Sequence, residues 1–296
     1  AEAAGCVPNL LPGYAEAGGA AGLTASEMLA RAAEGGLDAL LVVGANPALT
    51  SGDGATARRA LGRVPFLAVV DLLLTETAAC ADVVFPAAAF AEKRGHVTNI
   101  EGRRQAFGQA VEPPVTVATD AQILSALSGT LGFEGLISPD PDALFLELAA
   151  AEAAAASLRP KGAALPRPKV DEVPSTVADQ VDATHRRLTI VPLPHLYAGG
   201  GAAAHDPALA ELRPRPFAIL HPDDAGRIGV GHGERVVLEG PGGTIDVEAR
   251  VSDEAPLGVA LVVADLPEAP ENKLLDGSGF GTATATKAAA AREATA

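Results

Sequence analysis

The chain of 296 residues contains no tryptophan, and only 3% of its residues are aromatic. Hydrophobic residues make up 48% of the chain, but many of them are alanine, so leucine, valine and isoleucine must supply the large core side chains. The scarcity of aromatic rings also removes the stacking surfaces on which single-stranded nucleic acids bind. A chain of this length can nevertheless bury one large core or two ordinary ones.

Positive charge is also scarce, because 22 lysines and arginines stand against 37 aspartates and glutamates, for a formal net charge of −15. Such a surface repels nucleic-acid phosphates and anionic lipid head groups, so we expect neither nucleic acid nor a membrane surface as a partner. The acidic excess favours solubility instead. The most continuous apolar run, Ala255–Ala264, is too short to cross a bilayer.

Cysteine is limited to Cys6 and Cys80, which do not form a C-x-x-C pair. This pattern argues against a disulfide framework and against a cysteine-ligated zinc or iron–sulfur site, and it fits a reduced, cytosolic compartment. The chain opens abruptly on "AEAAGCVPNLLPGY", without a signal core. We therefore expect it to be part of a longer protein.

Residues 1–135 alternate predicted helices with short apolar strands. A capping box, Thr24 with Glu27, begins a helix, and the strand Ala39–Val43 follows it. A helix around Gly54 to Gly62 leads to the strand "FLAVVD", and a further helix begins at "TDAQIL". Strands and helices at this spacing predict an α/β region with a doubly wound, mostly parallel sheet.

The remainder of the chain has a different character. Residues 136–185 read as an alanine-rich helix followed by a proline-rich, basic linker. Residues 186–270 contain short strands separated by glycine turns, and in "GTIDVEARV" apolar and charged residues alternate, which predicts a small β-barrel. Residues 271–296 form a low-complexity tail, and we expect disorder from Gly277 onward, in "GSGFGTATATKAAAAREATA".

Most catalytic signatures are missing from the sequence. No G-x-G-x-x-G turn follows a strand, and there is no P-loop, H-E-x-x-H or G-x-S-x-G motif. The six histidines are scattered, and we interpret each as a surface or loop residue. The sequence therefore predicts no catalytic residue and no metal ligand, and attention turns to three stretches that are rich in polar groups.

The first stretch is "VVGANPAL", in which Gly44, Asn46 and Pro47 form a turn after a buried strand. The carboxyl edge of an open α/β sheet is where ligands bind, so the turn is a candidate binding loop. Asn-Pro is also a routine turn, and a strand must end somewhere.

The second stretch is "VVDLLLTETAACADVVFP". Asp71 ends a strand and could accept hydrogen bonds from a ribose or a guanine edge, while Thr75 and Thr77 could bind phosphate. The alternative for the two threonines is that they only cap the next helix.

The third stretch is "EKRGHVTNIEGRRQAF", residues 92–107, the densest run of charged and polar side chains. Its arginines could clamp a phosphate through paired hydrogen bonds. They could equally pair with Glu92 and Glu101 in a structural network. In that second case Arg103→Ala should lower stability by about 1–3 kcal/mol, because it would unpair a buried charge.

These stretches, in this order, resemble the molybdopterin oxidoreductase superfamily. The resemblance rests on "AGCVPNLLPGY", "ALLVVGANPAL", "VVDLLLTETAACADVVFPAAAFAEKRGHVTNIEGRRQ" and "TDAQILSALSGTLG". The segment "LHPDDAGRIGVGHGERVVLEGPGGTIDVEARVSDEAPLGVALVV" is similar to the family's C-terminal dinucleotide-binding domain. The resemblance implies a doubly wound sheet followed by a double-psi β-barrel.

Within the superfamily the chain most resembles the G subunit of bacterial NADH:quinone oxidoreductase, respiratory complex I. "TNIEGRRQ" has Gly102 where formate dehydrogenases tend to have a second arginine, and "LPHLYAGG" replaces the histidine-containing cofactor segment of catalytic members. The resemblance implies a cofactor-free C-terminal scaffold. This scaffold would support electron transfer from NADH to quinone by iron–sulfur clusters in the missing N-terminal part.

The resemblance also implies where a cofactor would bind, because the equivalent loops of relatives contact the nucleotide. It makes eight residues vestigial candidates for binding molybdopterin guanine dinucleotide: Gly44, Asn46, Pro47, Asp71, Thr75, Thr77, Asn99 and Arg103.

The implied partners are other peripheral-arm subunits of complex I, at the cytoplasmic face of the plasma membrane. An alternative is the cofactor-holding half of a molybdopterin enzyme such as a formate dehydrogenase, which would carry molybdopterin guanine dinucleotide. A third hypothesis is a standalone small-molecule-binding α/β module.

Overall fold

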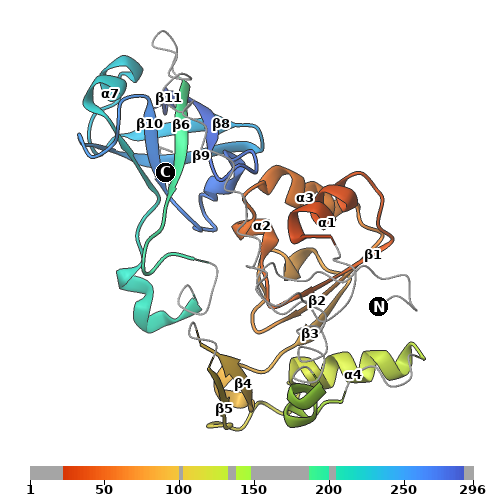
Figure 1. Cartoon of the computed structure of the whole chain (residues 1–296). Helices are drawn as coiled ribbons and strands as arrows, with labels where there is room; N and C mark the ends of the chain where they lie inside the picture. The colour runs from red at the N-terminus through yellow and green to blue at the C-terminus, as the bar shows by residue number, and fades with distance from the viewer. Residues whose placement is uncertain (1–22, 100–102, 133–137, 148–186, 200–204, 290–296) are drawn as a thin grey trace, which may run out of the picture. The chain divides into compact units, whose positions relative to one another are not determined.

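The computed structural model describes residues 23–99, 103–132, 138–147, 187–199 and 205–289 (Figure 1). The chain divides into two compact units, which we call the sheet unit and the barrel unit after their β-structure. The sheet unit comprises Ala1–Ala45, Val64–Leu74 and Ala78–Lys169, and the barrel unit comprises Asn46–Arg63, Thr75–Thr77 and Val170–Ala296.

The sheet unit contains a three-stranded parallel sheet in the order β1-β2-β3. Its strands are β1 (Ala39–Val43), β2 (Phe66–Asp71) and β3 (Val83–Pro86). Consecutive residues of β2 from Leu67 to Val70 are buried, as expected for a central parallel strand covered on both faces. The predicted strands at Ala39–Val43 and "FLAVVD" are confirmed.

Two helices of the sheet unit begin at threonine caps. Helix α1 (Ala25–Ala33) begins after Thr24, whose hydroxyl and backbone exchange hydrogen bonds with Glu27, so the predicted capping box is confirmed. Helix α4 (Asp120–Thr130) begins after Thr119 in the same way. On α4, Ile123 packs against Val70 and Ala87 and anchors the helix to the carboxyl end of β2.

A two-stranded antiparallel hairpin follows the sheet and contains the charged third stretch. It consists of β4 (Gly95–Thr98) and β5 (Arg104–Phe107). Two 3₁₀ turns precede it, η2 (Ala78–Cys80) and η3 (Phe90–Glu92), and a helix occupies residues 141–147.

The barrel unit begins with two short helices, α2 (Pro47–Thr50) and α3 (Gly54–Arg63). Six strands then close a barrel in the order β10-β6-β11-β8-β9-β7. The pairs β10–β6 and β7–β9 are parallel, and the other four pairs are antiparallel. The strands are β6 (Arg187–Leu193), β7 (Phe217–Leu220), β8 (Arg235–Gly240), β9 (Gly243–Val251), β10 (Val259–Val263) and β11 (Gly281–Lys287).

Apolar and polar residues alternate along the strands, and the apolar side chains form the core of the barrel. On β9, Ile245, Val247 and Ala249 are buried, while Asp246 is exposed, as the sequence pattern predicts. Three further elements connect the strands: η5 (Pro207–Leu212), α7 (Pro222–Ile228) and η6 (Glu271–Lys273). A parallel sheet together with a closed six-stranded barrel confirms the predicted α/β and barrel fold class.

The expectation of a disordered C-terminal stretch is wrong for residues 277–289. β11 lies between β6 and β8 and is antiparallel to both, so it completes the barrel. Its alternating alanines, Ala283 and Ala285, are buried, while Thr284 is exposed. The composition of "GTATATK" is that of a low-complexity segment, and alanine gives only a weak apolar signal, so the sequence pattern does not reveal this strand.

None of the helices in the described ranges combines the length and the apolar character needed to span a lipid bilayer.

Candidate functional site

The turn after β1 contains the first three candidate residues. Gly44 has a φ of 58°, a left-handed conformation that glycine adopts without strain, and its N–H donates to Val70 O at 2.8 Å. Pro47 is the first residue of α2, where its missing N–H leaves no helical hydrogen bond unmade. Gly44 belongs to the sheet unit, whereas Asn46 and Pro47 belong to the barrel unit.

Asn46 and Thr77 are brought together in the barrel unit, and we call their contact the Asn46–Thr77 clasp. The carboxamide oxygen of Asn46 accepts hydrogen bonds from the Thr77 hydroxyl at 2.8 Å and from the Thr77 N–H at 3.2 Å. The Thr77 hydroxyl in turn accepts from the Ala48 N–H at 3.1 Å. Asn46 also donates through Nδ2 to Glu76 at 2.6 Å.

Burial distinguishes the clasp from an ordinary surface turn. Thr77 is 0% exposed and Asn46 is 8% exposed, and the neighbouring Thr75 is also buried. Buried polar groups must be paired to avoid a desolvation cost, and here Asn46 and Thr77 pair with each other. The short 3₁₀ turn η2 begins directly after Thr77.

Asp71 lies at the carboxyl end of β2 in the sheet unit, as predicted. Its carboxylate accepts a hydrogen bond from the Leu72 N–H at 2.7 Å, and its backbone oxygen accepts from the Ala87 N–H at 3.0 Å. These bonds fix the end of the strand and leave Asp71 half-buried at the sheet edge.

Asn99 and Arg103 close the loop of the β4–β5 hairpin. The Asn99 side chain accepts from the Arg103 N–H at 2.8 Å, and the Asn99 N–H donates to Arg103 O at 3.0 Å. Both residues are exposed, so the expectation that Arg103 is a buried charged partner is wrong. Truncating its side chain should therefore cost little. Glu101, one of its expected partners, lies outside the described residues.

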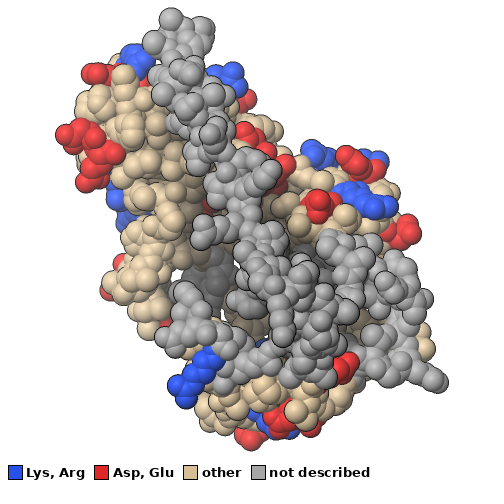
Figure 2. Space-filling view, in the orientation of Figure 1, with Lys and Arg blue, Asp and Glu red and all other residues tan. Residues whose placement is uncertain are grey.

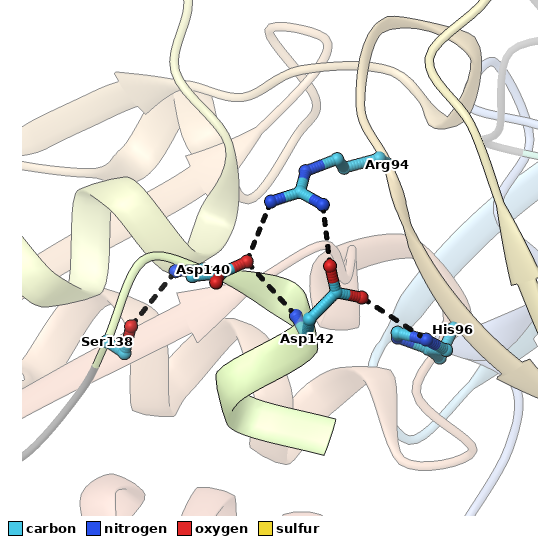
Figure 3. A network of polar contacts seen from close by, with 5 residues as sticks. All are labelled: Arg94, His96, Ser138, Asp140 and Asp142. Carbon is cyan, nitrogen blue, oxygen red and sulfur yellow. Dashed lines mark hydrogen bonds and ion pairs between the residues drawn. The ribbon is translucent and has the colours of Figure 1, made fainter. Parts of the chain in front are cut away.

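The ion pairs of the charged stretch involve partners that sequence reasoning missed. Arg94 contacts Asp140 at 2.7 Å and Asp142 at 2.8 Å, and we call these contacts the Arg94 network (Figure 3). His96 Nε2 lies 3.5 Å from the carboxylate of Asp142. The network joins the hairpin to the start of the helix at 141–147.

Two residues near this network depart from expectation. The ring of His96 stacks on Phe145 with centroids 4.2 Å apart and is half-buried, so it is not a simple surface histidine. The carboxylate of Glu92 accepts from the Ala89 N–H at 2.8 Å, where an arginine partner was expected. The charged stretch thus forms a structural network, as the sequence allowed, but with different acidic residues.

A second polar group in the barrel unit was not predicted from the sequence, and two of its members, Glu271 and Asn272, lie in the low-complexity tail. We call it the η6 cluster, and it consists of Arg58, Asp265, Glu271 and Asn272. Asn272 is 1% exposed, donates through Nδ2 to Ala48 O at 3.1 Å, and accepts from Arg58 Nη2. Glu271 is 4% exposed and accepts from the Asp265 N–H at 2.7 Å.

The electrostatics of the η6 cluster are dominated by burial. Burial raises the pKa of Glu271 to about 7; the charge of Asp265 adds to this rise, and the charge of Arg58 opposes it. Burial also raises the pKa of Asp265 and lowers that of Arg58.

The rest of the described surface offers little concentrated chemistry. Within the described ranges, no group of three or more histidine, cysteine, aspartate or glutamate side chains could hold a metal ion. On the face shown in Figure 2, acidic and basic side chains are interspersed rather than gathered into a patch of one sign. The Asn46–Thr77 clasp, the Arg94 network and the η6 cluster are therefore the features that a functional hypothesis must address.

Two family models match the chain. The model described as molybdopterin oxidoreductase matches residues 7–130, and the model described as Molydopterin dinucleotide binding domain matches residues 189–290. The second match extends past β11, in agreement with the place of that strand in the barrel.

Several curated proteins are similar in sequence. The NADPH-Fe(3+) oxidoreductase subunit alpha of Geobacter sulfurreducens is 28% identical over 83% of this chain and 29% of its own length. An NADH-quinone oxidoreductase G subunit of Rhizobium meliloti is 28% identical over 81% of this chain and 29% of its own length. The F420-dependent formate dehydrogenase subunit alpha of Methanocaldococcus jannaschii is 26% identical over 91% of this chain and 47% of its own length.

The chain thus spans less than half the length of these relatives. Among solved structures, the acetylene hydratase from Pelobacter acetylenicus matches with a TM-score of 0.59 and 16% identity. The match covers 90% of this chain and 47% of the acetylene hydratase chain. At this level of identity the likeness concerns the fold alone.

Proposed function

Because the chain belongs to the molybdopterin oxidoreductase superfamily, we propose that it is the C-terminal scaffold part of an NADH:quinone oxidoreductase G subunit. In this role it holds no molybdopterin cofactor. It supports electron transfer from NADH to quinone by iron–sulfur clusters that lie elsewhere in the longer protein. Its partners are other subunits of the peripheral arm, at the cytoplasmic face of the membrane.

The observation that carries this proposal is the Asn46–Thr77 clasp. Asn46 and Thr77 are two of the candidates for contacting a nucleotide, and their side-chain polar groups bond to each other and to Ala48. A ligand would have to break these bonds, each with a net contribution of about 0.5–1.5 kcal/mol, and leave buried groups unpaired. The pairing of these side chains within the protein supports the scaffold.

The remaining candidates are compatible with a loop that has kept its shape without its ligand. Gly44 turns the chain after β1, Asp71 bonds to the backbone that follows it, and Asn99 with Arg103 closes a hairpin. Under the proposal, all eight candidates are vestigial positions whose groups now organise the protein's own backbone.

A second candidate function is the cofactor-holding half of a molybdopterin enzyme such as a formate dehydrogenase. It is favoured by the match to the dinucleotide-binding domain and by the similarity to a formate dehydrogenase alpha subunit over 91% of this chain. Under this alternative the clasp opens when molybdopterin guanine dinucleotide binds.

Molybdenum and pterin content of the purified full-length protein separates the two functions. The scaffold predicts that neither molybdenum nor pterin is present in stoichiometric amount. Stoichiometric pterin, measured by fluorescence after oxidative release, would contradict the scaffold and favour the enzyme.

The variant Thr77→Val sharpens this test. If the chain is a scaffold, the variant should be less stable and its pterin content should not change. If the chain is part of a molybdopterin enzyme, the variant should lose pterin. Thr284→Val is the matched control, since Thr284 is exposed on β11 of the same unit.

A further inference from the structure

The 3₁₀ turn η6 fits closely against the start of α3. A Cβ atom added to Gly54 would lie 2.5 Å from Cγ of Asn272, so only glycine is accommodated there. Asn272 also holds both helices, because it donates to Ala48 O on α2 and accepts from Arg58 on α3. The α2–α3 segment is therefore fixed to the barrel by η6, and also by the Gly277 N–H, which donates to Gly52 O at 3.1 Å.

The adjacent residue, Glu271, holds the turn that follows β10. Asp265 in that turn has a φ of 57°, a left-handed conformation that costs free energy for a residue other than glycine. The Asp265 N–H donates to the Glu271 carboxyl at 2.7 Å and so stabilises this strained backbone. Because a backbone N–H bonds more strongly to a carboxylate, this bond favours the ionised form, whereas burial and the charge of Asp265 favour the neutral form and prevail.

The charges around Glu271 come from each element that packs against η6. Asp265 faces it from the turn after β10, and Arg58 faces it from α3. Lys273 lies on η6 itself, and β9 passes beside it, because a Cβ added to Gly243 would lie 3.6 Å from Cδ of Lys273. Within the described residues, Arg58 forms no ion pair with Glu271, and its buried Nη1 has no hydrogen-bond partner.

We propose that Glu271 is a proton-controlled latch between the barrel and the α2–α3 segment: the neutral carboxyl keeps η6 closed on α3, and the ionised carboxylate loosens it. Ionisation releases a proton to solvent and places a second negative charge beside Asp265 in a buried site. The attraction of Arg58 compensates only in part, because no direct ion pair forms.

The raised pKa of Glu271, about 7, determines the pH range in which the latch loosens and whether it loosens as the pH rises or falls. Because the folded pKa exceeds the ordinary value of 4.5, the carboxyl stabilises the closed state fully below pH 4.5. This stabilisation is lost as the pH rises through 7. The latch is thus closed in mild acid and loosened in mild base.

The latch also reaches the Asn46–Thr77 clasp. Ala48 accepts from Asn272 through its carbonyl oxygen and donates through its N–H to the Thr77 hydroxyl. A change at Glu271 therefore passes through Asn272 and Ala48 to the candidate ligand loop. This coupling holds whether or not the loop binds a cofactor.

Hydrogen–deuterium exchange of the full 296-residue chain, followed by mass spectrometry, tests the latch. Rates in residues 46–63 and 265–275 are measured from pH 6 to pH 8.5 and corrected for intrinsic exchange. The opening constant should rise about tenfold across this range, while strand β6 stays protected. Glu271→Gln should abolish the rise.

Glu254→Gln is the matched control, because it removes an exposed carboxylate from the same unit and should keep the rise seen in the parent protein. If Glu271→Gln retains that rise in full, the proposal is overturned.

Asp265→Asn keeps the test decisive if Glu271→Gln does not fold. Asparagine tolerates the left-handed conformation, and the substitution removes the like charge beside Glu271. The transition should therefore move to lower pH, and an unmoved transition would contradict the latch.

Discussion

The Arg94 network of the sheet unit and the buried polar groups of the barrel unit hold distant segments together by opposite means. The network uses full charges that remain in water: the Arg94 side chain is 54% exposed, and its two aspartates are 48% and 59% exposed. The clasp and Asn272 use amides and a hydroxyl that are almost completely buried, and Asn272 also pairs with the half-buried guanidinium of Arg58. The charged residues that stand out in the sequence thus form the Arg94 network, which remains exposed to solvent.

The difference indicates where stability resides. Exposed ion pairs contribute between about 0 and 1 kcal/mol and are screened by salt, whereas unpairing a buried polar group costs about 1–3 kcal/mol. The density of charge in a sequence is therefore a poor guide to the strength of the contacts that it forms.

The largest expected effect is that of Asn272→Ala. The substitution unpairs Ala48 O and the guanidinium of Arg58 together, so we expect a loss of about 3 kcal/mol in the free energy of unfolding. Urea denaturation followed by circular dichroism measures it. The control is Gln109→Ala, because Gln109 is exposed and bonds only to Val111 O through its side chain. Equal losses in the two variants would refute the comparison.

The next effect is pH dependence. Relative to Glu271→Gln, the parent protein should lose about 2 kcal/mol of stability between pH 5 and pH 8.5, since its Glu271 must ionise while buried. Urea titrations at several pH values give this difference. Parallel pH profiles of the two proteins would show that the site does not titrate as the structure implies.

Thr77→Val should have a smaller effect, a loss of about 1.5 kcal/mol, because it removes the hydroxyl that pairs Asn46 with the Ala48 N–H. Valine has nearly the same shape, so the change isolates the hydrogen bonds. Thermal unfolding beside Thr284→Val is the measurement. No difference between the two variants would mean that the clasp contributes nothing to stability.

Arg94→Ala should have the smallest effect, less than about 1 kcal/mol, because its partners are solvated. The loss should vanish in about 1 M salt, where the screening length is near 3 Å. A large loss of stability that persists in salt would mean that the Arg94 network contributes as much as the buried clasp. The two kinds of contact would then not differ in strength.

Local patterns account for what could be predicted from the sequence. The capping box at Thr24, the strands β1 and β2, and the alternation along β9 depend on neighbouring residues, and all are confirmed. The turn at Asn46 is a candidate binding loop for a similarly local reason, because it directly follows a strand.

The partners of these residues could not be predicted, because they are distant in sequence. Thr77 is 31 residues from Asn46, Asp140 is 46 residues from Arg94, and Asn272 is 214 residues from Arg58. The periodicity of a sequence does not reveal such long-range pairings. In β11 alanine alternates with threonine, so its apolar signal is weak. The sequence identifies which loops carry polar groups but not what those groups touch.

The contact between Arg58 and Asn272 has a consequence for synthesis on the ribosome. The α2–α3 segment emerges early, but the turn to which it is fixed is translated 214 residues later. At about 5–20 residues per second this leaves a delay of roughly 10–40 s. During that interval Asn272 cannot yet pair with Arg58 or Ala48, and β11 cannot yet close the barrel. Until η6 and β11 have been translated, the barrel unit of the nascent chain therefore lacks these contacts.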